Sequence, residues 1–186
     1  MDNGCINVID FGLAKEFRDP GTYLHIPYTE NNGLIGTVRY CSVNSHLGVE
    51  HAHCDNLESL AYILIYFLHG SLPWQSLETV SKKYKHERIM EKKQSTPIDV
   101  LCHGLPEEFT IFLNYARALP FDTKPDYSYI WKLFCNLSVQ HGYQYDHMFD
   151  WNIPQSGIPE GSTNGMHKER NERVRKVKEP CASDRR

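Results

Sequence analysis

The sequence of 186 residues has no Cys-X-X-Cys pair, no long apolar run and no marked net charge. Its six cysteines are scattered and no charged-then-apolar segment opens the chain, which argues against a disulfide framework and favours a reducing cytoplasmic or nuclear compartment. The longest apolar run, Leu60 to Leu68, has nine residues where a membrane-spanning helix needs about 20, so we expect a core helix and no membrane. The net charge of −3 gives no reason to expect nucleic acid as a partner.

Residues 156–186 differ in composition from the rest of the chain. They carry eight Lys/Arg against five Asp/Glu and almost no large apolar side chains, so burial cannot offset the entropy cost of ordering them. We expect a disordered, mildly basic tail there and one domain over residues 6–155. The charged run from Lys168 to Lys178 is either a solvated mixed-charge segment or a nuclear-import or weak polyanion-binding patch.

The first 45 residues show little helical periodicity. Residues 6–9 are apolar and end at a turn signal, which predicts a short buried strand. The stretch from Arg18 to Ser45 is rich in Gly, Pro, Asn and Thr, and it predicts a long loop. Loops of more than roughly 12 to 15 residues in a compact domain are usually functional or disordered.

Four helices are expected after this loop. The segment Asp55–His69 is apolar around its whole circumference and is closed by Gly70, which predicts a fully buried central helix. An amphipathic, largely solvated helix is expected over Leu77–Lys93, a third from near Pro106 and a fourth from Pro125-Asp126. The predicted fold class is therefore mainly α.

The tripeptide Asp10-Phe11-Gly12 comes directly after the apolar pair Val8-Ile9. An aspartate on a tight turn after a short strand is the arrangement that holds Mg²⁺ on ATP phosphates in protein kinases. By itself the tripeptide is a weak signal, and an ordinary turn is the default interpretation. Only further motifs at the right places along the chain can give it weight.

Such motifs occur in a fixed order, among them His25-Ile26-Pro27-Tyr28, Gly36-Thr37-Val38-Arg39-Tyr40, Ser42-Val43-Asn44, Leu57-Glu58-Ser59-Leu60, Gly70-Ser71-Leu72-Pro73-Trp74-Gln75, Lys124-Pro125-Asp126-Tyr127 and Phe149-Asp150-Trp151-Asn152. Together with Asp10-Phe11-Gly12 they closely resemble the casein kinase 1 family of Ser/Thr protein kinases. That family has Ser-Ile-Asn where other kinases have Ala-Pro-Glu, and Ser42-Val43-Asn44 matches it. The match runs without gaps from about residue 6 to 155.

The resemblance implies the second half of a protein-kinase-like large lobe, with the activation segment and about four helices, and with the N-terminal lobe absent. In the family Asp10 would coordinate Mg²⁺ and Ile9 would line the adenine pocket. The sequence contains no Gly-rich loop, no ATP-positioning lysine and no His-Arg-Asp loop. We therefore expect the family's Mg²⁺ and ATP not to be bound independently by this chain, and we expect no turnover by the chain alone.

Substrate recognition is better represented than catalysis. Kinases of the family that this chain resembles recognise anionic groups and prefer acidic or already phosphorylated protein substrates. Arg39, Gln75 and Lys85 match the family's substrate anion pocket, and Thr37 falls in the part of the activation segment that contacts the substrate. A guanidinium, an ammonium and an amide are suitable donors for phosphate oxygens. For Lys85 the alternative is one more solvated charge on a lysine-rich helix.

Several positions depart from the family pattern. Ser76 replaces a glycine beside the anion pocket, where it would crowd the anion or add a hydroxyl. A second basic site of the family keeps Lys15, but Asn32 stands where a lysine is usual. Asn56 replaces the aspartate that opens the buried helix in kinases, which would weaken catalysis, and Asp55 could compensate only through an awkward register shift.

A zinc site is a weaker alternative at His51, His53 and Cys54, which are zinc-ligand residue types. No partner pair has a recognised spacing elsewhere, and a structural zinc site needs four ligands. Residues of a surface loop are the preferred interpretation.

Three functions remain open from the sequence. The first is a truncated casein kinase 1-type Ser/Thr kinase that is inactive as this chain, the second is a pseudokinase-like module that binds acidic or phosphorylated peptides, and the third is a non-functional remnant. The helices that would cover Leu57–Leu68 are missing, and exposing five large side chains would cost roughly 8 to 15 kcal/mol, as much as a typical domain's stability. We therefore expect a marginal, sticky fold or a protein partner that covers this face.

Overall fold

The computed structural model describes residues 9–77 and 81–143, and over that part of the chain it is mainly α-helical, as predicted. Residues Phe11–Gly142 form one compact unit, which contains every helix of the described residues. The only extended pairing among the described residues is an isolated antiparallel bridge between Arg18 and His25. The predicted tail over residues 156–186 and most of the strand predicted over residues 6–9 lie outside the described residues.

The elements in chain order are the 3-10 helix η1 (Phe11–Leu13) and the α-helices α1 (Val43–His46), α2 (His53–His69), α3 (Lys82–Ser95), α4 (Ile98–Leu101), α5 (Glu107–Ala118) and α6 (Tyr127–Gln140). The four long helices are the four that the sequence predicts. The three short elements were not predicted, because a single turn is too short to show a periodic pattern. None of these helices is both long enough and apolar enough to cross a membrane.

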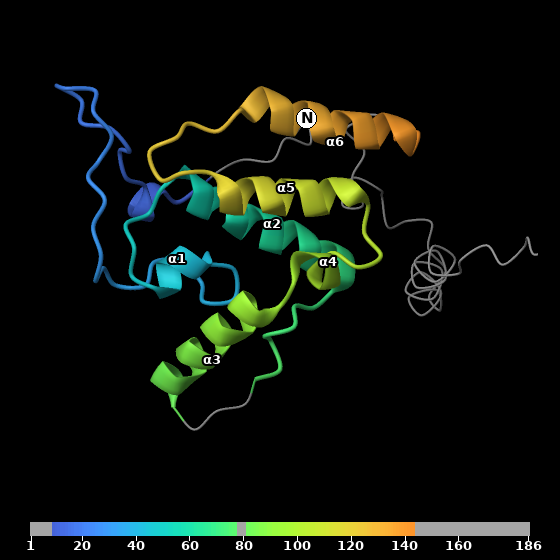
Figure 1. Cartoon of the computed structure of the whole chain (residues 1–186), viewed down its shortest axis with the longest axis horizontal. Coiled ribbons are helices and arrows are strands. Elements are labelled where there is room, and N and C mark those ends of the chain that lie inside the picture. The colour runs from blue at the N-terminus through green and yellow to red at the C-terminus, as the bar shows by residue number, and fades with distance from the viewer. Residues whose placement is uncertain (1–8, 78–80, 144–186) are drawn as a thin grey trace, which may run out of the picture. The chain divides into compact units, whose positions relative to one another are not determined.

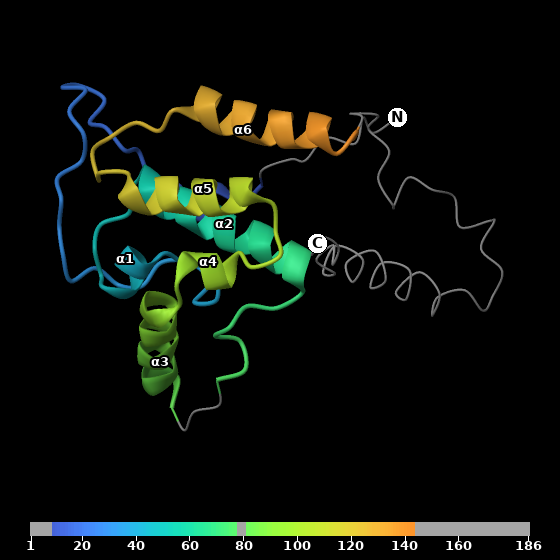
Figure 2. The ribbon, with the colours of Figure 1, turned by 45° about the vertical axis from the view of Figure 1, so that its right-hand side comes forward.

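Three of the long helices, α2, α5 and α6, stack in layers, and α3 extends away from them (Figures 1 and 2). α5 lies along α2, and α6 lies on the far side of α5, while α1 contacts both α2 and α3. The core fills the space between α2 and α5. Its most completely buried side chains are Tyr62 and Ile65 from α2, Phe112 and Leu113 from α5, and Trp74 from the turn after α2.

Two of the long helices, α3 and α6, begin at side-chain caps. Ser81 accepts from the backbone N–H of Tyr84 at 3.3 Å, which explains why α3 begins at Lys82 and not at Leu77 as predicted. Asp126 caps α6 in the same way, accepting from the N–H of Tyr129 at 2.9 Å.

The loop from Arg18 to Ser45 is irregular up to α1, in agreement with its composition. It is tied down at Asn32, whose N–H donates to the carbonyl of Gly48 at 2.9 Å. Gly48 has a φ of 73°, and a Cβ atom there would lie 2.9 Å from the carbonyl oxygen of Asn32. Only glycine fits this close approach of two backbone segments without a shift of one of them.

The prediction that α2 is fully buried is wrong for this chain. One face is buried and carries Leu57, Tyr62 and Ile65, but Phe67 is 66% exposed and Leu68 is 48% exposed. The apolar residues do surround the helix, yet α5 covers only one side of it among the described residues. The structure thus leaves an apolar strip on α2 open to solvent.

Candidate functional site

A cavity of about 250 Å³ lies among the loop of residues 37–42, the turn after α2 and the first turns of α3. We call it the basic cavity, because the described residues of its lining include Arg39 and Lys85 and no acidic side chain. The lining residues are Thr37, Val38, Arg39, Trp74, Gln75, Lys85, His86 and Ile89.

The basic cavity brings together every residue predicted for the anion pocket. Arg39, Gln75 and Lys85 come from three separate segments, and Thr37, the residue predicted for an activation segment, lines the same space. Lys85 lines the cavity and is also exposed. The two interpretations offered for it, an anion-pocket residue and a solvated charge on a helix, are therefore compatible.

Four lining residues were missed from the sequence: Val38, Trp74, His86 and Ile89. Val38 directly precedes Arg39, and Trp74 directly precedes Gln75, within the kinase-like motifs. This adjacency to predicted pocket residues could have identified them from the sequence. Ile89 lies four residues after Lys85 on α3, on the same side of the helix. His86 carried no signal of its own.

Arg39 is held against two aromatic rings. Its guanidinium carbon lies 5.7 Å from the ring centroids of both Tyr40 and Tyr66, and its NH1 donates to the Tyr40 hydroxyl at 3.5 Å. This hydrogen bond holds the pKa of Arg39 above its ordinary value. The side chain is exposed but pre-oriented, because stacking restricts its rotamers while its donors stay accessible.

Gln75 is fixed by the turn that contains it. Its Oε1 accepts from the N–H of Leu72 at 2.5 Å, and its own N–H donates to the carbonyl of Leu72 at 3.0 Å. With the oxygen bonded, the amide NH₂ is the group that can donate to a ligand. Ser76 is exposed and is not one of the lining residues, so it does not crowd the basic cavity.

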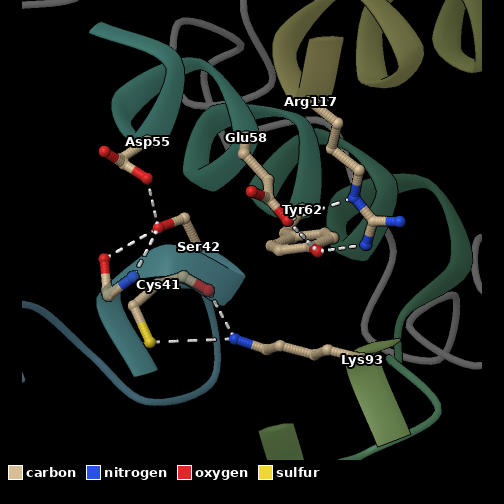
Figure 3. A network of polar contacts seen from close by, with 8 residues as sticks. Cys41, Ser42, Asp55, Glu58, Tyr62, Lys93 and Arg117 are labelled. Carbon is tan, nitrogen blue, oxygen red and sulfur yellow. Dashed lines mark hydrogen bonds and ion pairs between the residues drawn. The ribbon is translucent and has the colours of Figure 1, made fainter. Parts of the chain in front are cut away.

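The wall formed by residues 37–42 is anchored from the core (Figure 3). Lys93, which is completely buried, donates from Nζ to the carbonyls of Val38 at 2.9 Å and Cys41 at 2.5 Å. The indole Nε1 of Trp74 donates to the carbonyl of Arg39 at 2.8 Å. Hydrogen bonds therefore hold the backbone at Arg39 itself and at Val38 and Cys41, which flank it in sequence.

Asp55 anchors the end of the same wall. Its carboxylate accepts from the Ser42 hydroxyl at 2.7 Å and from the N–H of Ala52 at 2.8 Å, and it is 1% exposed. Asn56, the next residue, is exposed. Asp55 is thus committed to Ser42 and Ala52, which makes it unsuited to take over the role expected of an aspartate at position 56.

The second basic site predicted to be damaged has no available charge. Lys15 forms an ion pair with Glu50, with Nζ and Oε1 2.8 Å apart. The Asn32 side chain donates to the Thr29 hydroxyl at 3.0 Å. A lysine already neutralised by a carboxylate has little left to attract an anion.

Asp10 and Ile9, the predicted metal and adenine-pocket residues, are both exposed and belong to the other compact unit of the chain. Asp10 itself, and not Gly12, has the positive φ of the turn, at 62°. No group of three or more His, Cys, Asp or Glu side chains in the described part of the chain could hold a metal ion. Proteins hold Mg²⁺ through several oxygens, and the assignment of Asp10 to that ion stays a prediction.

The three residues considered for zinc are directed to different neighbours. His51 Nε2 is 2.5 Å from the Ser45 hydroxyl, and the His53 ring packs 4.5 Å from the ring of Phe17. Cys54 is buried, and its pKa is raised to about 12 by that burial. The surface-loop interpretation is wrong for His53 and Cys54, because both lie in the first turn of α2.

A larger cavity of about 310 Å³ is lined in part by Glu58 and Arg117. Arg117 Nε donates to Glu58 Oε1 at 3.2 Å, so the two charges neutralise each other. Cys54 also lines it, but a thiol with a raised pKa is a poor nucleophile. Size alone therefore does not make it the candidate site, and the basic cavity is better suited to bind a charged ligand. No family model matches this chain.

Proposed function

We propose that this chain is the substrate-recognition part of a casein kinase 1-type Ser/Thr protein kinase, the second half of its large lobe, and that the basic cavity binds acidic or phosphorylated protein segments. The observation that carries the proposal is the convergence of Thr37, Arg39, Gln75 and Lys85 on one cavity. The motifs that resemble the kinase family single out these positions independently of any coordinates.

The chemistry of the lining supports an anion as ligand. Arg39 and Lys85 supply two positive charges, and Gln75 and Thr37 supply neutral donors. A phosphate group offers three acceptor oxygens and a charge near −2, so it can use several of these donors at once. Hydrogen bonds between ionised partners are about twice as strong as neutral ones, which favours a phosphorylated over an unmodified segment.

Binding without turnover is the second candidate function. It is favoured because the wall of the basic cavity is anchored by Lys93, Trp74 and Asp55, all within the compact unit. The catalytic base and ATP-positioning lysine of a kinase have no counterpart in the sequence. Anion binding is thus shared by both candidates, and only turnover separates them.

Binding is tested with a peptide that carries one phosphoserine among acidic residues, alongside its unphosphorylated twin. The proposal expects the phosphorylated peptide to bind more tightly, and the double variant Arg39→Ala/Lys85→Ala to lose at least tenfold in affinity, since each charge-assisted hydrogen bond contributes about 1.5 to 3 kcal/mol. Equal affinity of wild type and double variant contradicts the proposal.

Matched controls exist on the same surface. Arg88 also lies on α3, is exposed and does not line the cavity, so Arg88→Ala removes the same charge as Lys85→Ala without touching the site. We expect its effect on affinity to be less than twofold. Incubation with Mg²⁺ and ATP then separates the candidates: no phosphate transfer to acidic peptides is expected, and turnover that Asp10→Ala abolishes would assign an active kinase.

A further inference from the structure

Lys93 is an ammonium group buried in the core without a carboxylate. The side chain is 0% exposed, and no ion pair found among the described residues includes it. Burial lowers the pKa of Lys93 from 10.5 to about 8. Burying a charge without a charged partner is unfavourable, so a hydrophobic residue of similar length would be the more stable choice here.

Both backbone hydrogen bonds of Lys93 lead to the wall of the basic cavity, while its ammonium also lies 5.2 Å from the ring centroid of Tyr62 in the core. Nζ donates to the carbonyls of Val38 and Cys41, and it lies 5.4 Å from the ring centroid of Trp74. Val38 and Trp74 line the basic cavity from the other side. The ammonium therefore lies on the core side of the wall that carries Arg39, and Figure 3 shows it next to Cys41 of that wall.

We propose that Lys93 is a positioning residue of the basic cavity, which fixes the backbone on either side of Arg39 so that the guanidinium faces a bound anion. This role rests on the proposed anion binding. Trp74 holds the carbonyl of Arg39 itself, and Lys93 holds those of Val38 and Cys41 around it. Without Lys93 this segment would lose two of the side-chain hydrogen bonds that hold its backbone.

The position of the backbone affects anion binding, because the guanidinium of Arg39 is oriented by stacking on neighbouring aromatic rings. Its guanidinium lies over Tyr40 and Tyr66, and the Tyr40 ring packs against that of Tyr66 with centroids 5.7 Å apart. A backbone shift of residues 38–41 would move Arg39 and Tyr40 together away from Tyr66, which belongs to α2 and stays in the core. Bidentate binding of phosphate depends on such orientation more than a point charge does.

The test compares Lys93→Met and Lys93→Gln in the full chain, with the phosphoserine peptide as probe. Met keeps length and packing but has no donor, and Gln keeps a donor without the charge. We expect peptide affinity to fall about fivefold to tenfold in Lys93→Met and less in Lys93→Gln. The resistance to urea should change little in Lys93→Met, because removal of the buried charge offsets the loss of a donor to the carbonyls of Val38 and Cys41. Lys92→Met is the matched control, because Lys92 is adjacent and exposed, and it should change neither quantity.

A second readout monitors the wall itself. The indole N–H of Trp74 should exchange slowly with solvent in wild type, and faster in Lys93→Met because the Arg39 carbonyl that it bonds is no longer held in place. Lys93→Met with wild-type affinity and a protected indole contradicts the positioning role. So does a Lys93→Met chain that fails to fold while Lys93→Gln folds and binds like wild type. Absence of peptide binding by wild type contradicts the proposed function instead.

Discussion

The indole Nε1 of Trp74 donates to the carbonyl oxygen of Arg39 at 2.8 Å, although 35 residues separate the two in sequence. This hydrogen bond joins the turn after α2 to the loop that carries the guanidinium of the basic cavity. Trp74 is 1% exposed, so the bond is shielded from water. Two walls of one cavity are thereby held at a fixed distance from each other.

Trp74→Phe tests this connection. The substitution keeps an aromatic ring in the core but removes the donor and some volume, which leaves the buried carbonyl of Arg39 unsatisfied. An unsatisfied buried acceptor costs about 1 to 3 kcal/mol, so we expect the free energy of unfolding to fall by at least that amount in urea titrations. Phosphopeptide affinity should fall as well.

The control for Trp74→Phe is Trp131→Phe, since Trp131 lies on α6 and is 67% exposed. It should change the free energy of unfolding by less than about 0.5 kcal/mol. If Trp74→Phe lowered stability yet left peptide affinity unchanged, the hydrogen bond would stabilise the core without positioning the residues that bind the peptide.

Lys93 makes stability depend on pH in the alkaline range. Its pKa is about 8 in the folded state and 10.5 in the ordinary, solvated state, so between these values the unfolded chain holds a proton that the folded chain has released. Stability therefore rises with pH over this window, by about 3 kcal/mol in total from this group. Below pH 8 both states are protonated, and the full cost of the buried charge is present.

The measurement is the difference in free energy of unfolding between wild type and Lys93→Met at pH 7, 8, 9 and 10. Both chains carry Cys41→Ala, because burial raises the pKa of the Cys41 thiol while Lys93 lowers it, so the effect of this thiol, which has the opposite sign, would not cancel in the difference. The free energy of unfolding of wild type should increase relative to that of Lys93→Met as pH rises above 8. A difference that stays constant would show that Lys93 has an ordinary pKa.

The long helices were predictable because their signals are local. Pro106 and Asp126 stand at helix starts and Gly70 at a helix end, whereas the Ser81 cap, and with it the start of α3, was missed. The residues of the basic cavity were predictable from the family resemblance alone, since three distant segments have no local pattern in common.

Lys93 was not predictable from its own surroundings. It stands next to Lys92 at the end of a helix rich in charges, a pattern that is typical of a solvated surface. Its burial depends on Trp74 and on residues 38–41, which are distant in sequence. The one local hint is Ile89, four residues earlier and 5% exposed, which places Lys93 on the buried side of α3.

Removal of Arg117 should strongly destabilise the chain. Arg117 donates to Glu58 and, at 2.7 Å, to the hydroxyl of Tyr62, and the Glu58 side chain is only 6% exposed. Arg117→Ala leaves this carboxylate buried without its partner, which costs about 3 to 5 kcal/mol when a buried pair is broken from one side. Thermal unfolding measures the loss, and Arg88→Ala, which breaks the exposed pair with Glu91, should cost less than about 1 kcal/mol.

The apolar strip on α2 leads to the last prediction. Phe67 and Leu68 are 66% and 48% exposed, whereas Ile65 on the same helix is fully buried. Phe67→Gln/Leu68→Gln should reduce binding of a dye that fluoresces on apolar surfaces and should reduce self-association, while unfolding free energy changes by less than about 1 kcal/mol, since Gln is a good helix former. Ile65→Gln, the matched control, should unfold the chain, because it buries an amide in the core. A wild-type chain that melts cooperatively and binds no dye would contradict an open apolar strip, and it would mean that other residues of the chain already cover this face of α2.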